Sequence, residues 1–433
     1  MATITLSRVA SAARSRAAAS GAARREFSSI MTAVEEFPGL PTTSPTPGKA
    51  TSASVTTLPN GLTVVTEDAS ATSTLSLTFP SAGSSAESAS QQGAALANKA
   101  MAFKSGSGLS SALILRNIEN DGATPFASAG RVGATIGFTA APDKVVRIMP
   151  LLATDCTFEK WDVRDAIALA GYEAAQANSN AQIALTEQIY AAAFGAQTSM
   201  GRPFYSSGAS KQAVRSFREA NYGLNGAVLA ATGVEDHEAF VRAAEHQFSE
   251  SPVGDASAPS DAPAFIGGEA RIQASIGYAH VAIAFPAPAS SALASVVKHC
   301  LAISGAEAFA GPGIVGVYGG ADSAGVAGIV DSLCAAALVS PSAAVVERAK
   351  NLAKAEALFA LDGGSQSLAE AMTASVMETG TFSVAGVSEA YDAVTEADVA
   401  AAFGDMKKAG PAVASVGDIA SVPYHATIAS CFS

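Results

Sequence analysis

The sequence predicts an α+β protein of two homologous α/β sandwich domains that together form a clamshell. Each domain is expected to be a mixed, mostly antiparallel sheet with helices packed on one face. The first observation behind this prediction is length, because 433 residues are more than a single hydrophobic core usually serves. The second is an internal repeat, since the second half of the chain follows the same order of sequence features as the first.

Composition narrows the class of protein further. Hydrophobic residues make up 49% of the chain and charged residues 15%, which is typical of a globular protein with ample apolar material to bury. The longest apolar stretch, 324–339, is interrupted by Asp331 and Ser332, so no segment reaches the roughly 18 apolar residues of a membrane helix. The net charge of −12 argues against nucleic-acid partners, because phosphate binding needs clustered Lys and Arg. We expect a chain that is soluble or is held at a membrane by its partners.

The four cysteines are widely spaced and form no C-x-x-C pattern: Cys156, Cys300, Cys334 and Cys431. Such spacing favours neither a disulfide framework nor a zinc site. We therefore expect four buried thiols in a reducing compartment.

Residues 1–27 have the composition of a mitochondrial targeting presequence. They contain five arginines, many Ala and Ser, and the single acid Glu26. The run Arg25-Glu26-Phe27-Ser28 predicts cleavage after Phe27. The alternative is a disordered basic tail.

Two segments rich in Pro, Ser and Gly divide the remaining chain. Residues 28–52 are predicted to be a linker or an extended arm, and residues 251–264 a linker between the two domains. The N-terminal domain is then expected over 53–250 and the C-terminal domain over 265–433.

The repeat begins with a strand and a helix in each half. Apolar residues alternate over 75–79 and over 281–285, which predicts strands. These strands end in the similar segments FPSAGSSA and FPAPASSA. Helices are expected next, over 94–103 and 292–303.

Two later landmarks complete the repeat. The segments that start at Val145 and Val326 each predict a helix, a short break and a longer helix. The segments AVLAATGVED (227–236) and AVASVGDIAS (412–421) each predict a strand that runs into Gly. Three landmarks in the same order indicate gene duplication.

Three segments near the start resemble the insulinase-type zinc peptidases: the opening strand TLPNGLTVVTED (57–68), the strand before 79–86, and GAALANKAMAFKSGS (93–107). The resemblance covers nearly the whole chain after residue 55. Mitochondrial members of this family are the processing-peptidase subunits and the core subunits of respiratory complex III. Active members carry H-x-x-E-H just before an MAFK-like tetrapeptide; its histidines bind zinc, and its Glu takes a proton from the metal-bound water.

The resemblance places the family's catalytic positions on residues that cannot perform this chemistry. With MAFK at 101–104, the first His position is Leu96, the catalytic Glu position is Lys99, and the second His position is Ala100. The family's third ligand falls on Glu173. We expect no catalytic residue, no metal ligand and no cofactor, a helix kept for packing, and at Glu173 a solvated or paired surface carboxylate. The histidines offer no replacement motif: His237, His246, His280, His299 and His425.

Three other features have simple structural interpretations. The segment GPGIVG (311–316) matches G-x-G-x-x-G but precedes a strand-like run, which argues against a dinucleotide site. By resemblance it corresponds loosely to a longer Gly-rich substrate loop of the non-catalytic processing-peptidase subunit. The Ser-rich run 81–90 lacks a nucleophile motif and is expected to be a loop. Trp161, in the KWDV segment, is expected to be a buried anchor.

The resemblance leaves three functions open. The first is a non-catalytic core subunit that supports the assembly and stability of complex III, peripheral on the matrix side of the mitochondrial inner membrane. The second is the non-catalytic substrate-recognition subunit of the processing peptidase, or a dual-role protein. The third is an active zinc peptidase. Leu96, Lys99 and Ala100 argue against it, because they replace the residues of the H-x-x-E-H motif.

Length favours the first function, because the processing-peptidase subunit is usually longer. The resemblance then implies a dimeric assembly without a transmembrane span in this chain. Its partners would be a core subunit 1 homologue, cytochrome b, cytochrome c1 and the iron–sulfur protein.

Overall fold

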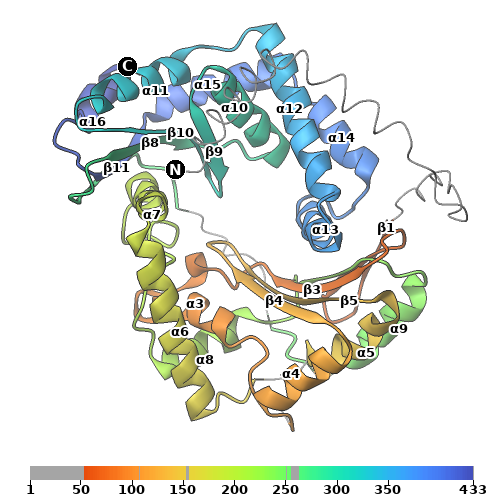
Figure 1. Cartoon of the computed structure of the whole chain (residues 1–433). Helices are drawn as coiled ribbons and strands as arrows, with labels where there is room; N and C mark the ends of the chain where they lie inside the picture. Colours follow the sequence, from red (N-terminus) through yellow and green to blue (C-terminus); the bar gives the residue numbers. More distant parts are fainter. Residues whose placement is uncertain (1–52, 107, 153–155, 250, 255–262, 433) are drawn as a thin grey trace, which may run out of the picture. The chain divides into compact units, whose positions relative to one another are not determined.

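The structure is a computed structural model that describes residues 53–106, 108–152, 156–249, 251–254 and 263–432. These described residues belong to one compact unit. They form two mixed sheets, each accompanied by helices (Figure 1). The predicted targeting segment (1–27) and arm (28–52) lie outside the described residues.

The first sheet has six strands in the order β1-β2-β6-β3-β5-β4. All neighbours are antiparallel except β2 and β6, which are parallel. The strands are β1 (Ala53–Thr57), β2 (Thr63–Glu67), β3 (Ser73–Phe79), β4 (Thr124–Ala129), β5 (Ala134–Ala140) and β6 (Val228–Ala231).

The second sheet has five strands in the order β7-β11-β8-β10-β9. Its single parallel pair, β7 and β11, occupies the place that β2 and β6 occupy in the first sheet. The same topology in both halves confirms the predicted repeat and the mixed, mostly antiparallel sheets. The strands are β7 (Gly268–Gln273), β8 (Ala279–Pro286), β9 (Glu307–Gly311), β10 (Ile314–Ala321) and β11 (Ala412–Gly417).

The helices follow the predicted order in both halves. The first half contains α3 (Ala94–Ala100), α4 (Ser111–Asn120), α5 (Val145–Ile148), α6 (Lys160–Ser179), α7 (Ala181–Phe194), α8 (Lys211–Asn221) and α9 (His237–Gln247). The second contains α10 (Ser291–Ile303), α11 (Val326–Leu338), α12 (Ala343–Leu361), α13 (Ser365–Thr379), α14 (Val384–Asp392), α15 (Glu396–Ala409) and α16 (His425–Ser430).

Two predicted elements differ in detail. The segment 57–68, predicted as one opening strand, holds the end of β1, a turn and then β2, because Leu58 and Leu62 close the turn with a backbone hydrogen bond. The helix predicted over 94–103 ends at Ala100. Phe103 has a φ of 58°, a left-handed conformation that cannot continue a right-handed helix.

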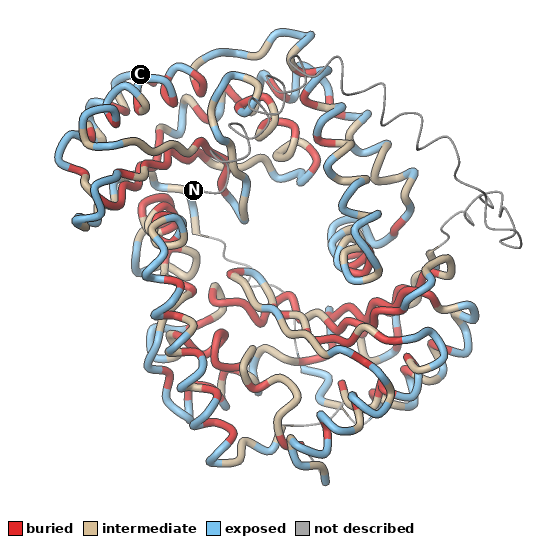
Figure 2. Tube along the Cα trace, in the orientation of Figure 1, coloured by how far each residue is buried: buried red, intermediate tan, exposed pale blue. Residues whose placement is uncertain are grey.

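Alternation along the central strands positions the two main cores. Leu75, Leu77 and Phe79 of β3 pack with residues of α4, α5 and α9. Val281, Ile283 and Phe285 of β8 pack with residues of α10, α11, α12 and α15. Figure 2 shows the central strands as mostly buried, with exposed residues along the outer sides of the helices. One face of each sheet is therefore covered by helices of its own half, as predicted.

The opposite face of each sheet also contacts a helix, which the sequence did not predict. Ala282 and Ala284 of β8 belong to a buried cluster with Leu185 and Ile189 of α7. Conversely, buried residues of β2 and β6 pack against Leu368, Ala369, Met372 and Val376 of α13. Each half thus contributes one helix to the sheet of the other half.

A buried ion pair fixes α7 to the first half. Arg131, in the turn between β4 and β5, lies 2.7 Å from Glu187 of α7, and their side chains are 7% and 6% exposed. The Arg131 guanidinium also donates to the carbonyls of Met200 and Arg202, while Glu187 accepts from the Phe204 N–H. Burial raises the pKa of Glu187, and the adjacent Arg131 opposes that rise. Because the groups satisfy one another, the charges are tolerated inside the protein.

The cysteine prediction is correct only in part. Cys300 and Cys334 are buried, and burial raises the pKa of their thiols to about 11 and about 12. Cys156 is half-buried and Cys431 is exposed, so the expectation of four buried thiols is wrong for these two. Cys431 directly follows the short helix α16, and it is the next residue, Phe432, that packs into the core of the second half. All four cysteines are free.

No single helix among the described residues is long and apolar enough to cross a membrane. Helices α11 and α12 meet the length and hydropathy criteria only as a pair, with a bend of 100° between them.

Replacing Arg131 by Met should destabilise the protein by about 3–5 kcal/mol, because it leaves the Glu187 carboxylate buried without its partner. Chemical denaturation measures this loss. The double variant R131M/E187M should recover part of it, since no unpaired charge remains. R242M, in an exposed ion pair with Glu238, is the control and should change stability by no more than about 0.5 kcal/mol. Equal effects of R131M and R242M would contradict the assigned role.

Candidate functional site

The candidate site is built around α3, the short helix on which the resemblance places the metal-binding positions. Gly93 precedes the helix with a φ of 85°, and a Cβ there would lie 2.9 Å from the Ser206 carbonyl oxygen. Both facts require glycine. The Glu87 carboxylate accepts hydrogen bonds from the N–H groups of Gly93 and Ala95, at 3.0 and 2.7 Å, and so caps the first turn.

Glu87 is an ionisable group that the sequence interpretation missed. It is buried, and its burial raises the pKa of the carboxyl group to about 7, although the N–H groups of Ala95 and Gly93 and the charge of Arg202 act in the opposite direction. No motif marks this residue, because it lies in a Ser-rich segment whose loop conformation alone was predicted. Only the folded structure brings its side chain to the start of α3.

Small side chains pack α3 against α6. Leu96 and Ala97 of α3 belong to one buried cluster with Val163, Ala166 and Ala170 of α6. On α6 these residues recur at helical spacing and form one face. Leu96, at the first His position, is fully buried in this cluster. The position is therefore used for apolar packing.

Lys99 and Glu173 form the central contact of the site. The Lys99 Nζ lies 2.6 Å from Glu173 Oε1, and the two side chains are 27% and 33% exposed. The pair joins the position of the family's catalytic Glu to the position of its third metal ligand. This confirms the prediction that Glu173 is a paired carboxylate near the surface. An ammonium group thus lies beside the carboxylate that, by resemblance, would otherwise bind zinc.

The residues at this site do not fit a zinc ion. Leu96 and Ala100 carry no donor atom, Lys99 is cationic, and Glu173 alone supplies a carboxylate, whereas a catalytic zinc site has three protein ligands. Across the part of the chain that the structure describes, His, Cys, Asp and Glu form no group of three or more that could hold a metal.

The histidines serve other contacts. His237 bridges the Thr56 and Thr66 hydroxyls, His280 contacts the Tyr318 hydroxyl, and His299 contacts Glu356. His425 lies 3.0 Å from the Pro411 carbonyl oxygen. None of these histidines is on α3 or α6.

Trp161 is not the buried anchor that we expected. It is 57% exposed, because it lies on the side of α6 opposite the face that packs on α3. The buried residues of the KWDV segment are Asp162 and Val163, and the Asp162 carboxylate accepts from the Ser105 N–H at 3.2 Å. This bond ties the start of α6 to the loop that follows MAFK.

The segment 311–316 joins two strands, as its sequence indicated. Gly311 ends β9 and Ile314 begins β10, so only Pro312 and Gly313 form the turn, with Gly313 at a φ of 76°. A dinucleotide-binding motif would instead open a helix. This segment is a tight hairpin.

Glu87 should make stability depend on pH. Because its pKa is raised in the folded state from an ordinary value of 4.5 to about 7, its stabilising effect is complete below pH 4.5 and is lost as the pH rises through 7. Between these values the free energy of unfolding should fall by about 1.4 kcal/mol per pH unit. Denaturation of native protein and E87Q across this range measures the difference. E119Q, on the exposed surface of α4, is the control, and identical profiles for native protein and E87Q would overturn the assignment.

Restoring the family's side chains should create a metal site. The triple variant L96H/K99E/A100H places two imidazoles on one face of α3 and releases Glu173 from its ion pair, so it should bind about one zinc ion per chain. Equilibrium dialysis with metal analysis measures this stoichiometry. Adding E173A to the triple variant should remove tight binding. Equal binding by both variants would contradict the place assigned to Glu173.

Comparisons with known proteins find similarity both in sequence and in fold. Residues 63–206 match the family described as Insulinase (Peptidase family M16). The mitochondrial-processing peptidase subunit alpha of Solanum tuberosum is 31% identical over 242 residues, covering 54% of this chain and 47% of that protein. The chain thus spans about half the length of this relative. Subunit alpha-2 of the same peptidase from Dictyostelium discoideum is 24% identical over 87% of this chain and 94% of its own length.

A comparison of folds finds similarity over both halves of the chain. A chain of the solved structure titled "Complex III2 from Candida albicans, Inz-5 bound" matches 88% of this chain and 99% of its own length, with a TM-score of 0.72 and 20% identity. The shared fold includes the second half, which the family match does not reach. Residues 63–206 thus match the insulinase (M16) peptidase family, and the fold of this chain is shared with that solved structure over both halves.

Proposed function

We propose that this chain is core subunit 2 of mitochondrial ubiquinol–cytochrome c reductase, complex III. In this role it is a non-catalytic subunit that supports assembly and stability of the complex, peripheral on the matrix side of the inner membrane. Its partners would be the core subunit 1 homologue, cytochrome b, cytochrome c1 and the iron–sulfur protein.

The observation that carries the non-catalytic part of the proposal is the Lys99–Glu173 ion pair. It occupies the two positions that an active member uses for proton transfer and metal binding. Leu96 is buried in the α3–α6 contact, so the site serves packing. The likeness in fold to a chain from complex III, over almost all of that chain, supports the choice of assembly.

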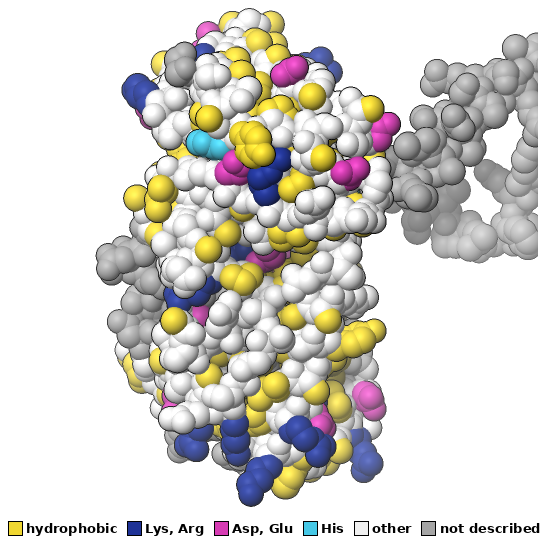
Figure 3. Space-filling model, turned by 90° about the vertical axis from the view of Figure 1, so that its left-hand side faces the viewer, with side chains coloured by type: hydrophobic (Ala, Val, Ile, Leu, Met, Phe, Trp, Pro, Cys, Tyr) yellow, Lys and Arg dark blue, Asp and Glu magenta, His cyan; other side chains and the backbone are white. Residues whose placement is uncertain are grey.

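The exposed side of α6 supports a role within an assembly. Trp161, Leu169 and Tyr172 are large apolar residues of this helix that stay exposed. Figure 3 shows hydrophobic side chains spread among uncharged ones on one face of the molecule, with Lys and Arg gathered toward its lower end. Large aromatic residues are enriched at protein–protein interfaces. A partner subunit would bury such residues.

The second candidate is the non-catalytic substrate-recognition subunit of the processing peptidase, or a dual-role protein. It is favoured by sequence, because the relatives from Solanum tuberosum and Dictyostelium discoideum are both alpha subunits of that peptidase. The two-residue turn at Pro312 and Gly313 argues against it, since the resemblance places a long Gly-rich substrate loop there.

Co-purification separates the two candidates. A tagged copy of the full chain, isolated from gently solubilised mitochondria, should carry haem-bearing cytochromes and migrate at the mass of the complex III dimer. The absorbance of the haem and native mass measurement check this result. Recovery with a soluble H-x-x-E-H partner alone would favour the processing subunit instead.

Depletion of this chain tests whether assembled complex III depends on it. An obligate interface typically buries about 2,000 Å² or more, so partners of that size stabilise one another by mass action. Depleting the chain should lower assembled complex III and ubiquinol oxidation while presequence cleavage continues. Intact complex III together with accumulated uncleaved precursors would contradict the proposal.

A further inference from the structure

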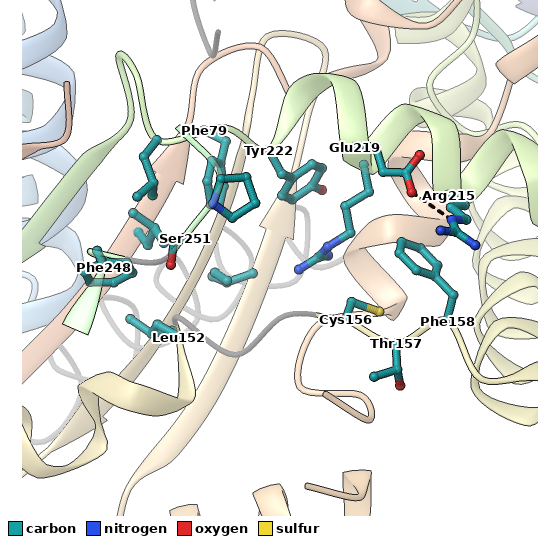
Figure 4. Close-up of a pocket in the computed structure, with 15 residues that line it drawn as sticks. Phe79, Leu152, Cys156, Thr157, Phe158, Arg215, Glu219, Tyr222, Phe248 and Ser251 are labelled. Carbon is teal, nitrogen blue, oxygen red and sulfur yellow. Dashed lines mark hydrogen bonds and ion pairs between the residues drawn. The ribbon is translucent and has the colours of Figure 1, made fainter. Parts of the chain in front are cut away.

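The first half contains a cavity of about 450 Å³ that the proposed function does not use. It lies against the first sheet beside the end of α8, the segment 156–158, and Phe248, Ser251 and Pro252 (Figure 4). Its volume falls within the range of small-molecule sites, about 300–1,000 Å³. Much of the wall is apolar and is formed by Leu77, Phe79, Ile136, Leu152, Leu224 and Phe248.

The rest of the wall carries charge from α8. Arg215 donates to Glu219 at 2.7 Å, so these two charges satisfy each other, as the dashed line in Figure 4 marks. Within the described part of the chain, Arg218 forms no ion pair with a carboxylate. Its guanidinium lies over the Tyr222 ring, 4.6 Å from the ring centre, and its Nη1 is buried without a hydrogen-bond partner among the described residues.

Among the described residues that line the cavity, the only acid is Glu219, which Arg215 already engages. Burial raises the pKa of Tyr222 to about 12, so its hydroxyl stays neutral. A second, smaller cavity shares Arg218 and Cys156 with the first, and among its described lining residues the other charged one is the cation Lys104. A buried cationic donor without an acceptor is costly, and an anionic ligand would remove that cost.

We propose that this cavity binds an anionic amphiphile, a carboxylate or phosphate on an aliphatic tail. The anionic oxygens accept from Arg218, and the tail lies on the apolar wall. A free inorganic anion would leave the apolar wall uncovered, and a neutral apolar molecule would leave Arg218 without an acceptor. A free fatty acid and a lipid phosphate share this chemistry. The proposal is independent of the assembly to which the chain belongs.

Cys156 provides a direct reporter of occupancy. Its side chain lines the cavity and is half-buried, whereas Cys431 is exposed and lies outside the cavity wall. Alkylation of the native full chain, followed by peptide mass mapping, reports both thiols in one sample. Sodium dodecanoate and dodecyl phosphate, both below their micelle concentrations, are the anionic probes. Dodecyltrimethylammonium has the same tail with a cationic head, and acetate has the anionic head without the tail.

At least one anionic probe should slow alkylation of Cys156 and leave Cys431 unchanged. The two control compounds should protect neither thiol. Stronger protection by dodecanoate assigns a free carboxylate as ligand, and stronger protection by dodecyl phosphate assigns a lipid phosphate. Absence of protection by both anions, or equal protection by the cationic amphiphile, would overturn the proposal.

Arg218 can also be tested by substitution. R218Q should weaken binding of the protecting probe by about 10- to 100-fold, because a hydrogen bond to a charged group is lost. R242Q removes an exposed arginine of α9 and should leave the affinity unchanged. Unchanged affinity in a folded R218Q chain would contradict the role of Arg218. If R218Q fails to fold, the comparison of probes on the native chain still decides the question.

Discussion

The fold depends on the exchange of one helix between the two sheets. Helix α7 covers a face of the second sheet, and α13 covers a face of the first. Each sheet therefore has apolar residues on both faces, and each half relies on the other to bury one of them. The Arg131–Glu187 pair holds α7 to its own half while the apolar side of that helix serves the other. Loss of either attachment would expose apolar surface in both halves.

Packing between helices also explains how α3 is held in place without a metal. In an active peptidase, a metal ion would tie α3 to α6 through side chains of both helices. Here apolar packing around Leu96 and one ion pair, Lys99 with Glu173, connect the same two helices. The ion pair is partly exposed, so the apolar contact supplies most of the stabilisation. The helix can be retained by packing after its metal chemistry has gone.

Much of the fold could be predicted because it follows from local periodicity and repetition. Alternation over 75–79 and 281–285 identified the two central strands, and the repeat predicted a common topology. The family resemblance, which rests on a motif of fixed spacing, placed Lys99 at the catalytic Glu position and Glu173 at the third ligand position. The domain boundaries at 250 and 265 and the targeting segment stay predictions.

Other features could not be predicted because they depend on contacts between distant segments. The exchange of α7 and α13 requires knowing which sheet face each helix meets, and periodicity does not specify that. The exposure of Trp161 depends on which side of α6 packs on α3. Glu87, Arg131 and Arg218 belong to no motif. Glu87 and Arg131 become buried only in the folded chain, and Arg218 lies at a cavity whose wall comes from several separate segments.

The zinc content of the native chain decides whether the α3–α6 site has lost its metal. After dialysis of the purified protein against a buffered zinc solution and removal of loosely bound metal, metal analysis reports the ions held per chain. With Leu96, Lys99 and Ala100 at the three motif positions, we expect no stoichiometric zinc and no cleavage of a presequence peptide by the isolated chain. One tightly held zinc ion per chain would contradict this expectation.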